Sequence, residues 1–64
     1  MKTKSQVIRD LIGKRINFDD GAIHETTDMV AMEVTYADDE IICVTMLGTA
    51  AYIFVDQVKA VYMK

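Results

Sequence analysis

Short extended runs fill the sequence from Lys14 onward, and connections of only two to four residues separate most of them. Within the runs, apolar side chains recur at alternate positions, which is typical of β-strands. Connections this short join antiparallel neighbours, because a parallel pair needs a long crossover. The chain contains no proline, so every run is free to lie inside a sheet. The pattern therefore favours an antiparallel meander.

A short helix is predicted over about 5–12, before the first strand. Apolar residues recur there at helical spacing, at Val7, Ile8, Leu11 and Ile12. Thr3 or Ser5 is suited to cap the start, and Gly13 is well placed to end the helix. Two turns of helix are too short to be stable alone, so the apolar stripe is expected to pack on the strands.

The predicted strands cover residues 14–19, 22–36, 41–47, 51–55 and 58–63. Asp20-Gly21 is a tight-turn signal between the first two, while the polar start of the second, AIHETTD, fits a short strand, a bulge or a loop. We expect one domain over 1–64 of the mainly β class. Its short N-terminal helix precedes a five-stranded, strongly bent antiparallel sheet or small barrel.

Two of the predicted strands, 41–47 and 51–55, are apolar on both faces. Such strands are normally covered on both sides. In a chain this short, the second cover is expected to come from another subunit. Tyr52 and Phe54 share one face of the later strand, Ile53 and Val55 share the other, and one of these pairs must lie outside the core. The candidate residues for subunit contact are Ile41, Cys43, Ile53, Phe54 and Val55.

Size and composition also favour self-association. A domain of 64 residues buries only about 60% of the surface of its unfolded chain, and small domains usually need a further source of stability. Cys43 and His24 are the only cysteine and histidine, so a disulfide within the chain and a Cys/His metal site are absent. Hydrophobic residues make up 52% of the chain, above the usual range of about 45–50%. A homo-oligomer is therefore expected.

Charge is distributed unevenly along the chain. Within residues 1–15, five basic residues stand against Asp10, whereas residues 16–64 contain nine acids and two lysines, Lys59 and Lys64. A basic N-terminus of this kind is either a solvated segment or an arm that holds nucleic-acid phosphates without reading bases. The acidic remainder disfavours broad nucleic-acid affinity. The candidate phosphate contacts are Lys2, Lys4, Arg9, Lys14 and Arg15.

Residues for catalysis and metal binding are sparse. Cys43 lies within an apolar run, where a thiol is expected to be inert. His24, Glu25 and Asp28 have poor spacing for chelation on a strand. A glycine-rich phosphate loop is also missing. The sequence predicts no enzyme, no cofactor and no metal. The lone cysteine and the lack of a long apolar run favour a cytoplasmic protein without a membrane partner.

In layout, the chain resembles the Sm-like fold, and more broadly the SH3-like small β-barrels. A helix leading into Leu11-Ile12-Gly13-Lys14 and a strand ending in Asp20-Gly21 are similar to the way many Sm-like proteins begin. The end, YIFVDQVKAV, is similar in its strand, very short turn and strand. The resemblance implies a small barrel that assembles into a ring or another oligomer.

Both RNA-binding motifs of that family are missing. The expected aspartate, hydrophobic residue and asparagine would start at Asp28, but no asparagine follows it. The expected Ile-Arg-Gly corresponds to Ile53-Phe54-Val55, in which phenylalanine replaces the base-contacting arginine. The resemblance therefore does not carry RNA binding over to this chain.

The sequence as a whole favours a non-enzymatic interaction module. We expect a homo-oligomer that binds a protein or a small ligand at its subunit interfaces. The alternative is an Sm-like nucleic-acid-binding protein that uses the basic N-terminal arm. Small acidic proteins of this kind are common among bacterial, plasmid and phage accessory proteins, and such a source is predicted here from size and general character, not from any residue.

Overall fold

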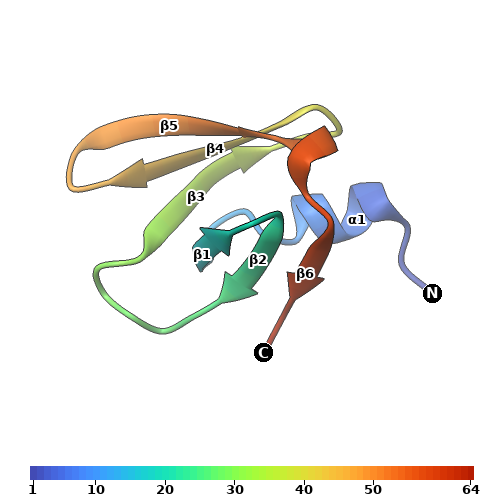
Figure 1. Ribbon diagram of the computed structural model, residues 1–64, viewed down its shortest axis with the longest axis horizontal. Helices are drawn as coiled ribbons and strands as arrows, with labels where there is room; N and C mark the ends of the chain where they lie inside the picture. Colours follow the sequence, from blue (N-terminus) through green and yellow to red (C-terminus); the bar gives the residue numbers. More distant parts are fainter.

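One short helix and six strands follow one another in the computed structural model, which describes residues 1–64 (Figure 1). The elements are α1 (Lys4–Arg9), β1 (Arg15–Asp19), β2 (Ala22–Glu25), β3 (Met32–Ala37), β4 (Ile41–Met46), β5 (Thr49–Phe54), the 3₁₀ turn η1 (Val55–Gln57) and β6 (Ala60–Tyr62). The strands form a single sheet in the order β5-β4-β3-β1-β2-β6. The predicted mainly β class with a short N-terminal helix is confirmed.

Helix α1 begins with a reciprocal cap. The Gln6 backbone N–H donates to the Thr3 hydroxyl at 3.2 Å, and the Thr3 N–H donates to the Gln6 side chain at 2.9 Å. The helix is shorter than the predicted 5–12, because the N–H groups of Leu11 and Ile12 bind carbonyls three residues back and tighten the chain into turns. Gly13, with φ +84°, then redirects the chain into β1.

Two hairpins have two-residue turns whose residues both have positive φ. Asp20 and Gly21 join β1 to β2 with φ of 51° and 84°, as the Asp-Gly signal predicts. Leu47 and Gly48 join β4 to β5 with φ of 50° and 81°. The expected strands 41–47 and 51–55 leave residues 48–50 for this second turn, whereas the structure confines it to Leu47 and Gly48, because Thr49 already pairs with Met46.

The predicted strand 22–36 is wrong as one element: β2 and β3 are separated by residues 26–31. Side-chain oxygens organise this connection. The Asp28 N–H donates to the Thr26 hydroxyl at 3.1 Å, and the Val30 N–H donates to the Asp28 carboxylate at 3.1 Å. These local bonds compete with the ladder of a sheet, so the chain turns instead of extending.

A β-bulge in β3 changes the face on which Tyr36 lies. Strict alternation would place Tyr36 on the same side as Val34. The register with β4 shifts between these two residues, and Val34 and Ala37 are both buried while Tyr36 is half exposed. The extra residue thus moves Tyr36 to the outer face of the sheet.

The end of the chain forms a sixth strand that is parallel, not antiparallel, to its neighbour. After η1 the chain crosses to the β1–β2 hairpin, where the N–H groups of Lys59 and Ala60 donate to the Gly21 carbonyl at 2.6 and 3.3 Å. β6 then pairs with β2 in parallel. The sheet is mixed, and it does not close, because β5 and β6 remain its two edges.

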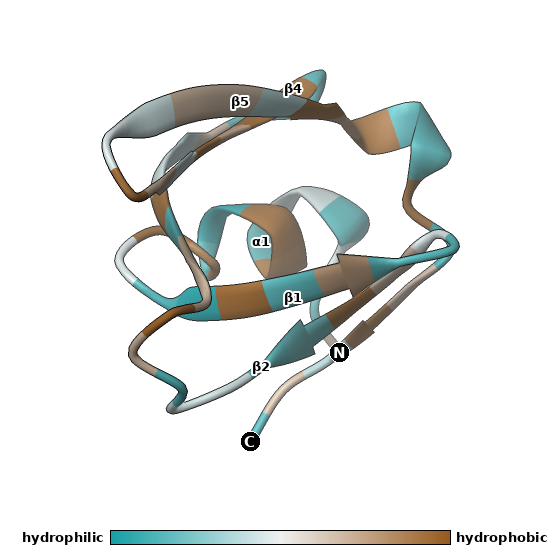
Figure 2. Ribbon diagram, turned by 60° about the vertical axis from the view of Figure 1, so that its left-hand side comes forward, coloured by the Kyte–Doolittle hydropathy of each residue, from teal (hydrophilic) through white to brown (hydrophobic).

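The bent sheet encloses the core, and α1 contributes to it (Figure 2). The ten buried residues of this core are Ile8, Leu11, Ile16, Ile23, Val34, Ala37, Ile42, Val44, Ile53 and Val55. No buried side-chain polar atom lacks a hydrogen-bond partner. The single α-helix has six residues and is not long and apolar enough to cross a bilayer.

Gly21 and Gly48 form a matched pair for testing the crossing of the C-terminal segment. A Cβ at Gly21 would lie 3.1 Å from the Gln57 carbonyl oxygen, whereas a Cβ at Gly48 meets nothing within 4 Å. Both glycines have positive φ, which costs any other residue about 1–2 kcal/mol. We expect Gly21→Ala to lower the free energy of unfolding by about 1 kcal/mol more than Gly48→Ala, in urea denaturation. Equal losses would contradict the close packing at Gly21.

Candidate functional site

The outer side of β3, β4 and β5 carries a row of apolar side chains that the strand register aligns. Tyr36 pairs with Cys43, Cys43 pairs with Tyr52, and Ile41 pairs with Phe54. Directly opposed residues of an antiparallel pair lie on the same face, with Cβ atoms about 4.5–5.5 Å apart. We call this surface the aromatic face, and its members are Tyr36, Ile41, Cys43, Tyr52 and Phe54.

The aromatic rings of this face are largely open to solvent. The exposed fractions are 50% for Tyr36, 60% for Tyr52 and 59% for Phe54. Ile41 and Cys43 lie half-buried between them. Single exposed apolar residues are ordinary, but a contiguous group across three strands is typical of a contact surface.

The free edge of β5 continues the aromatic face. β5 ends the sheet and spans Thr49–Phe54, a segment with no charged residue and no proline. Natural edge strands are usually blunted by charges, prolines, bulges or short length, because unpaired N–H and C=O groups attract other strands. β5 has none of these within its six residues, and its ladder with β4 is regular.

A hydrogen-bonded turn fixes one end of the face. The Asp38 carboxylate accepts from the N–H groups of Glu40 and Ile41 at 2.8 and 2.9 Å, and from the Tyr36 hydroxyl at 3.0 Å. The two backbone donors, and then the tyrosine, hold the pKa of Asp38 below its ordinary value. The same hydrogen bond to Asp38, together with the negative charge of that carboxylate, raises the pKa of Tyr36.

The structure divides the five predicted contact residues between two places. Ile53 and Val55 are 8% and 3% exposed and belong to the core of a single chain, so they offer no surface for another subunit. Phe54, Ile41 and Cys43 lie on the outer face. Sequence alternation paired the residues correctly, but only the direction of the sheet's bend shows which pair lies inside.

Two tyrosines of the face were not among the predicted contact residues. Tyr52 shares the alternation of Phe54, so the sequence carried a signal for it. Tyr36 gave no such signal, because its outward position depends on the bulge in β3.

The basic N-terminal residues are dispersed, and several contact the chain's own acids. Lys2 pairs with Asp10 at 2.5 Å, Arg9 with Asp39 at 3.7 Å and Lys14 with Glu25 at 3.6 Å.

Arg15 and Lys4 differ from these three. The Arg15 guanidinium donates to the carbonyls of Met29 and Ala31, at 3.3 and 3.5 Å. Lys4 forms no ion pair and lies at the rim of a groove between α1 and β6. The five basic residues are thus shared among different neighbours and do not form one strip.

Chemistry-bearing side chains elsewhere remain apart. The His24 ring stacks on Tyr62 with 4.7 Å between centroids and an interplanar angle of 8°. His24 lies on β2 and Cys43 on β4, with β1 and β3 between them in the sheet. No group of three His, Cys, Asp or Glu side chains is arranged to hold a metal ion.

Comparison with known protein families, with curated proteins and with solved structures finds no match for this chain.

Tyr36 is expected to ionise at higher pH than an ordinary tyrosine. The hydrogen bond that raises the Tyr36 pKa contributes fully to the stability of the fold at pH values below the ordinary tyrosine pKa. This contribution is lost as the pH rises through the pKa that Tyr36 has in the folded state. Absorbance titration of the phenolate should show one late transition that Tyr36→Phe removes and Tyr52→Phe retains. Asp38→Asn should move the transition toward the ordinary value. A late transition that survives Tyr36→Phe would contradict the assignment.

Glu substitutions at the adjacent positions 54 and 55 should distinguish an exposed side chain from a buried one. Val55→Glu places a carboxylate among buried apolar side chains, at a cost of several kcal/mol, which approaches the roughly 3–5 kcal/mol that a core of this size provides. Phe54→Glu places it in solvent. Circular dichroism should show an unfolded Val55→Glu chain and a folded Phe54→Glu chain. A folded Val55→Glu chain would contradict the burial of Val55.

Proposed function

We propose that this protein is a non-enzymatic binding module that self-associates through the aromatic face and the adjoining edge of β5. The assembly then binds a protein or a small ligand where subunits meet. The observation that carries this proposal is the continuity of an exposed aromatic surface with an uncharged, unpaired strand edge.

The strand edge supports a specific mode of contact. An added strand would satisfy the outward N–H and C=O groups of β5 by β-augmentation. Side chains of the added strand, or of the next strand of the second copy, would at the same time cover Tyr52 and Phe54. Main-chain hydrogen bonds would set the register of the contact, while burial of the rings would provide most of the favourable free energy.

The total surface area of the single chain is close to that of an ordinary compact monomer, and apolar side chains make up part of it. A compact monomer of 7.2 kDa has an expected accessible surface of roughly 4,100 Å². The single chain exposes 4435 Å², with three aromatic rings of the face among its exposed large side chains. Association would remove this apolar area from water.

The resemblance of the chain's layout to Sm-like proteins is a further reason to propose an oligomer. The proposal does not extend to nucleic acid. Arg9 and Lys14 already lie beside carboxylates of the same chain, and the phenylalanine at position 54 stands where the family places a base-contacting arginine.

Tyr52→Glu tests the proposed surface. Self-association would bury the ring at this position, and a carboxylate there would have to lose its hydration. We expect the dissociation constant of the assembly to rise at least tenfold, measured by sedimentation velocity over a concentration series. The folded structure should persist, because the Tyr52 side chain is 60% exposed in the single chain.

Met29→Glu is the matched control. Met29 is more exposed, at 77%, and lies in the loop between β2 and β3, away from the aromatic face. Met29→Glu adds the same charge as Tyr52→Glu, so a loss of assembly caused only by net charge would affect both variants. An assembly that Tyr52→Glu leaves intact would remove the aromatic face from the contact.

A further inference from the structure

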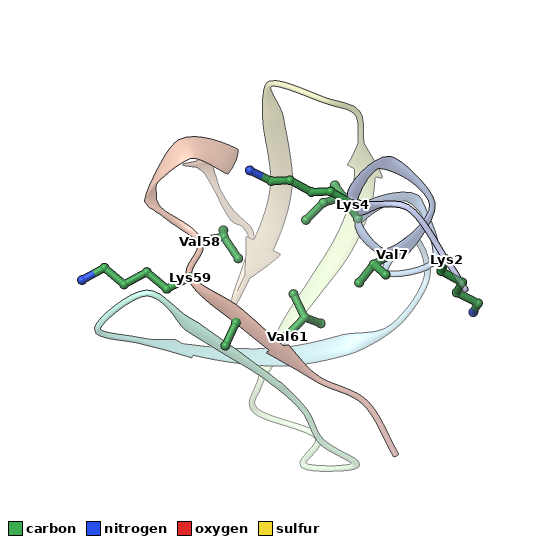
Figure 3. A pocket seen from close by; sticks show the side chains of 8 residues that line it. Lys2, Lys4, Val7, Val58, Lys59 and Val61 are labelled. Carbon is green, nitrogen blue, oxygen red and sulfur yellow. The ribbon is translucent and has the colours of Figure 1, made fainter.

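A groove of about 370 Å³ separates α1 from the C-terminal segment (Figure 3). Val7 on α1 and Val61 on β6 point toward each other across it, and Val58 points into the same gap. The remaining lining residues are Lys2, Lys4, Ile8, Lys59 and Ala60. The interior of the groove is therefore apolar, and its charged residues are all lysines.

The groove differs in charge from the rest of the protein. No carboxylate lines it, although the chain carries a net charge of −3 and each of the other three hollows contains at least one aspartate. Lys4 and Lys59 take part in no ion pair. Lys4 extends from α1 across the groove, whereas Lys59 extends outward from the rim of the groove, past Gly21 (Figure 3). An apolar group flanked by carboxylates has the chemistry that complements this site.

The same chain presents such a group at one end of β5. A second hollow is lined by Asp39, Glu40, Ile41, Phe54 and Asp56. The Phe54 side chain is 59% exposed there and has acidic residues around it. The N–H of Val55 donates to the Glu40 carbonyl at 2.8 Å, which ties the segment carrying Phe54 to the acidic turn.

The basic groove and the acidic Phe54 hollow are neighbours on the molecule. A third, smaller hollow lies between them and shares Lys4 with the groove and Asp39 with the acidic side. Ser5 hydrogen-bonds to Asp39, and Arg9 lies 3.7 Å from it. Two complementary sites that are adjacent on one surface match reciprocally when a second copy is related by a two-fold axis.

We propose that the groove between α1 and β6 receives Phe54 and its flanking carboxylates from a second copy of this chain, reciprocally, in a two-fold dimer. This inference rests on the proposed self-association and specifies its partner surface. Phe54 lies against Val7, Val58 and Val61 of the other copy, while Lys4 and Lys59 face its Glu40 and Asp56. Because both charged sets lie at a partly exposed rim, the contact weakens with salt.

Charge exchange tests this dimer. Lys59→Glu and Asp56→Lys each place like charges across the proposed contact, and each should raise the dimer dissociation constant about tenfold in sedimentation equilibrium. The double variant Lys59→Glu with Asp56→Lys restores opposite charges and should recover most of the wild-type affinity. Lys64→Glu is the control, because it changes the net charge by the same amount as Lys59→Glu at a residue outside the groove. It should leave the dimer dissociation constant within about twofold of the wild-type value.

Three results would overturn the inference, and they are distinguishable. If Tyr52→Glu weakens assembly but the Lys59 and Asp56 variants do not, self-association stands and the groove is not its partner surface. If the wild-type protein is monomeric at every concentration, the proposed function fails as well. If native mass spectrometry finds a small anionic molecule that wild type retains and Lys4→Glu loses, the groove holds a ligand and not a second copy.

Discussion

The supply of apolar side chains exceeds what the interior of this small sheet can hold. Hydrophobic residues make up 52% of the chain, yet only 12 of its 64 residues are buried. The buried set fills the inside of the bend with aliphatic side chains, while Tyr36, Tyr52 and Phe54 remain outside. This surplus, together with a sheet that ends in an uncharged edge strand, is the physical basis of the proposed self-association.

Local rules in the sequence predicted the helix cap, the first hairpin turn and most strand positions. These features depend on neighbours in the chain: Thr3 caps the helix through Gln6, and Asp20-Gly21 supplies the two positive φ values. The expected helix end at Gly13 is wrong, because α1 already ends at Arg9 with Asp10 as its C-cap. The parallel β6 was not predictable in this way. It depends on a contact between the Gly21 carbonyl and the N–H groups of Lys59 and Ala60, which are distant in sequence.

The candidate site also combines features that local sequence rules predict with features that depend on the whole fold. Alternation established that Tyr52 and Phe54 share one face and Ile53 and Val55 the other, but both pairs are apolar, so hydrophobicity alone did not distinguish inside from outside. The position of Tyr36 required a bulge whose extra residue has no sequence signature of its own. The basic N-terminal residues are continuous in sequence, whereas the fold distributes them among separate carboxylates and carbonyls.

Native mass spectrometry of the wild-type protein over a range of concentrations would show whether a second copy of the chain is available to cover the aromatic face. Self-association predicts species at integral multiples of 7.2 kDa that become more abundant with concentration. A single 7.2 kDa species at every concentration would contradict self-association as the way this apolar surface is covered.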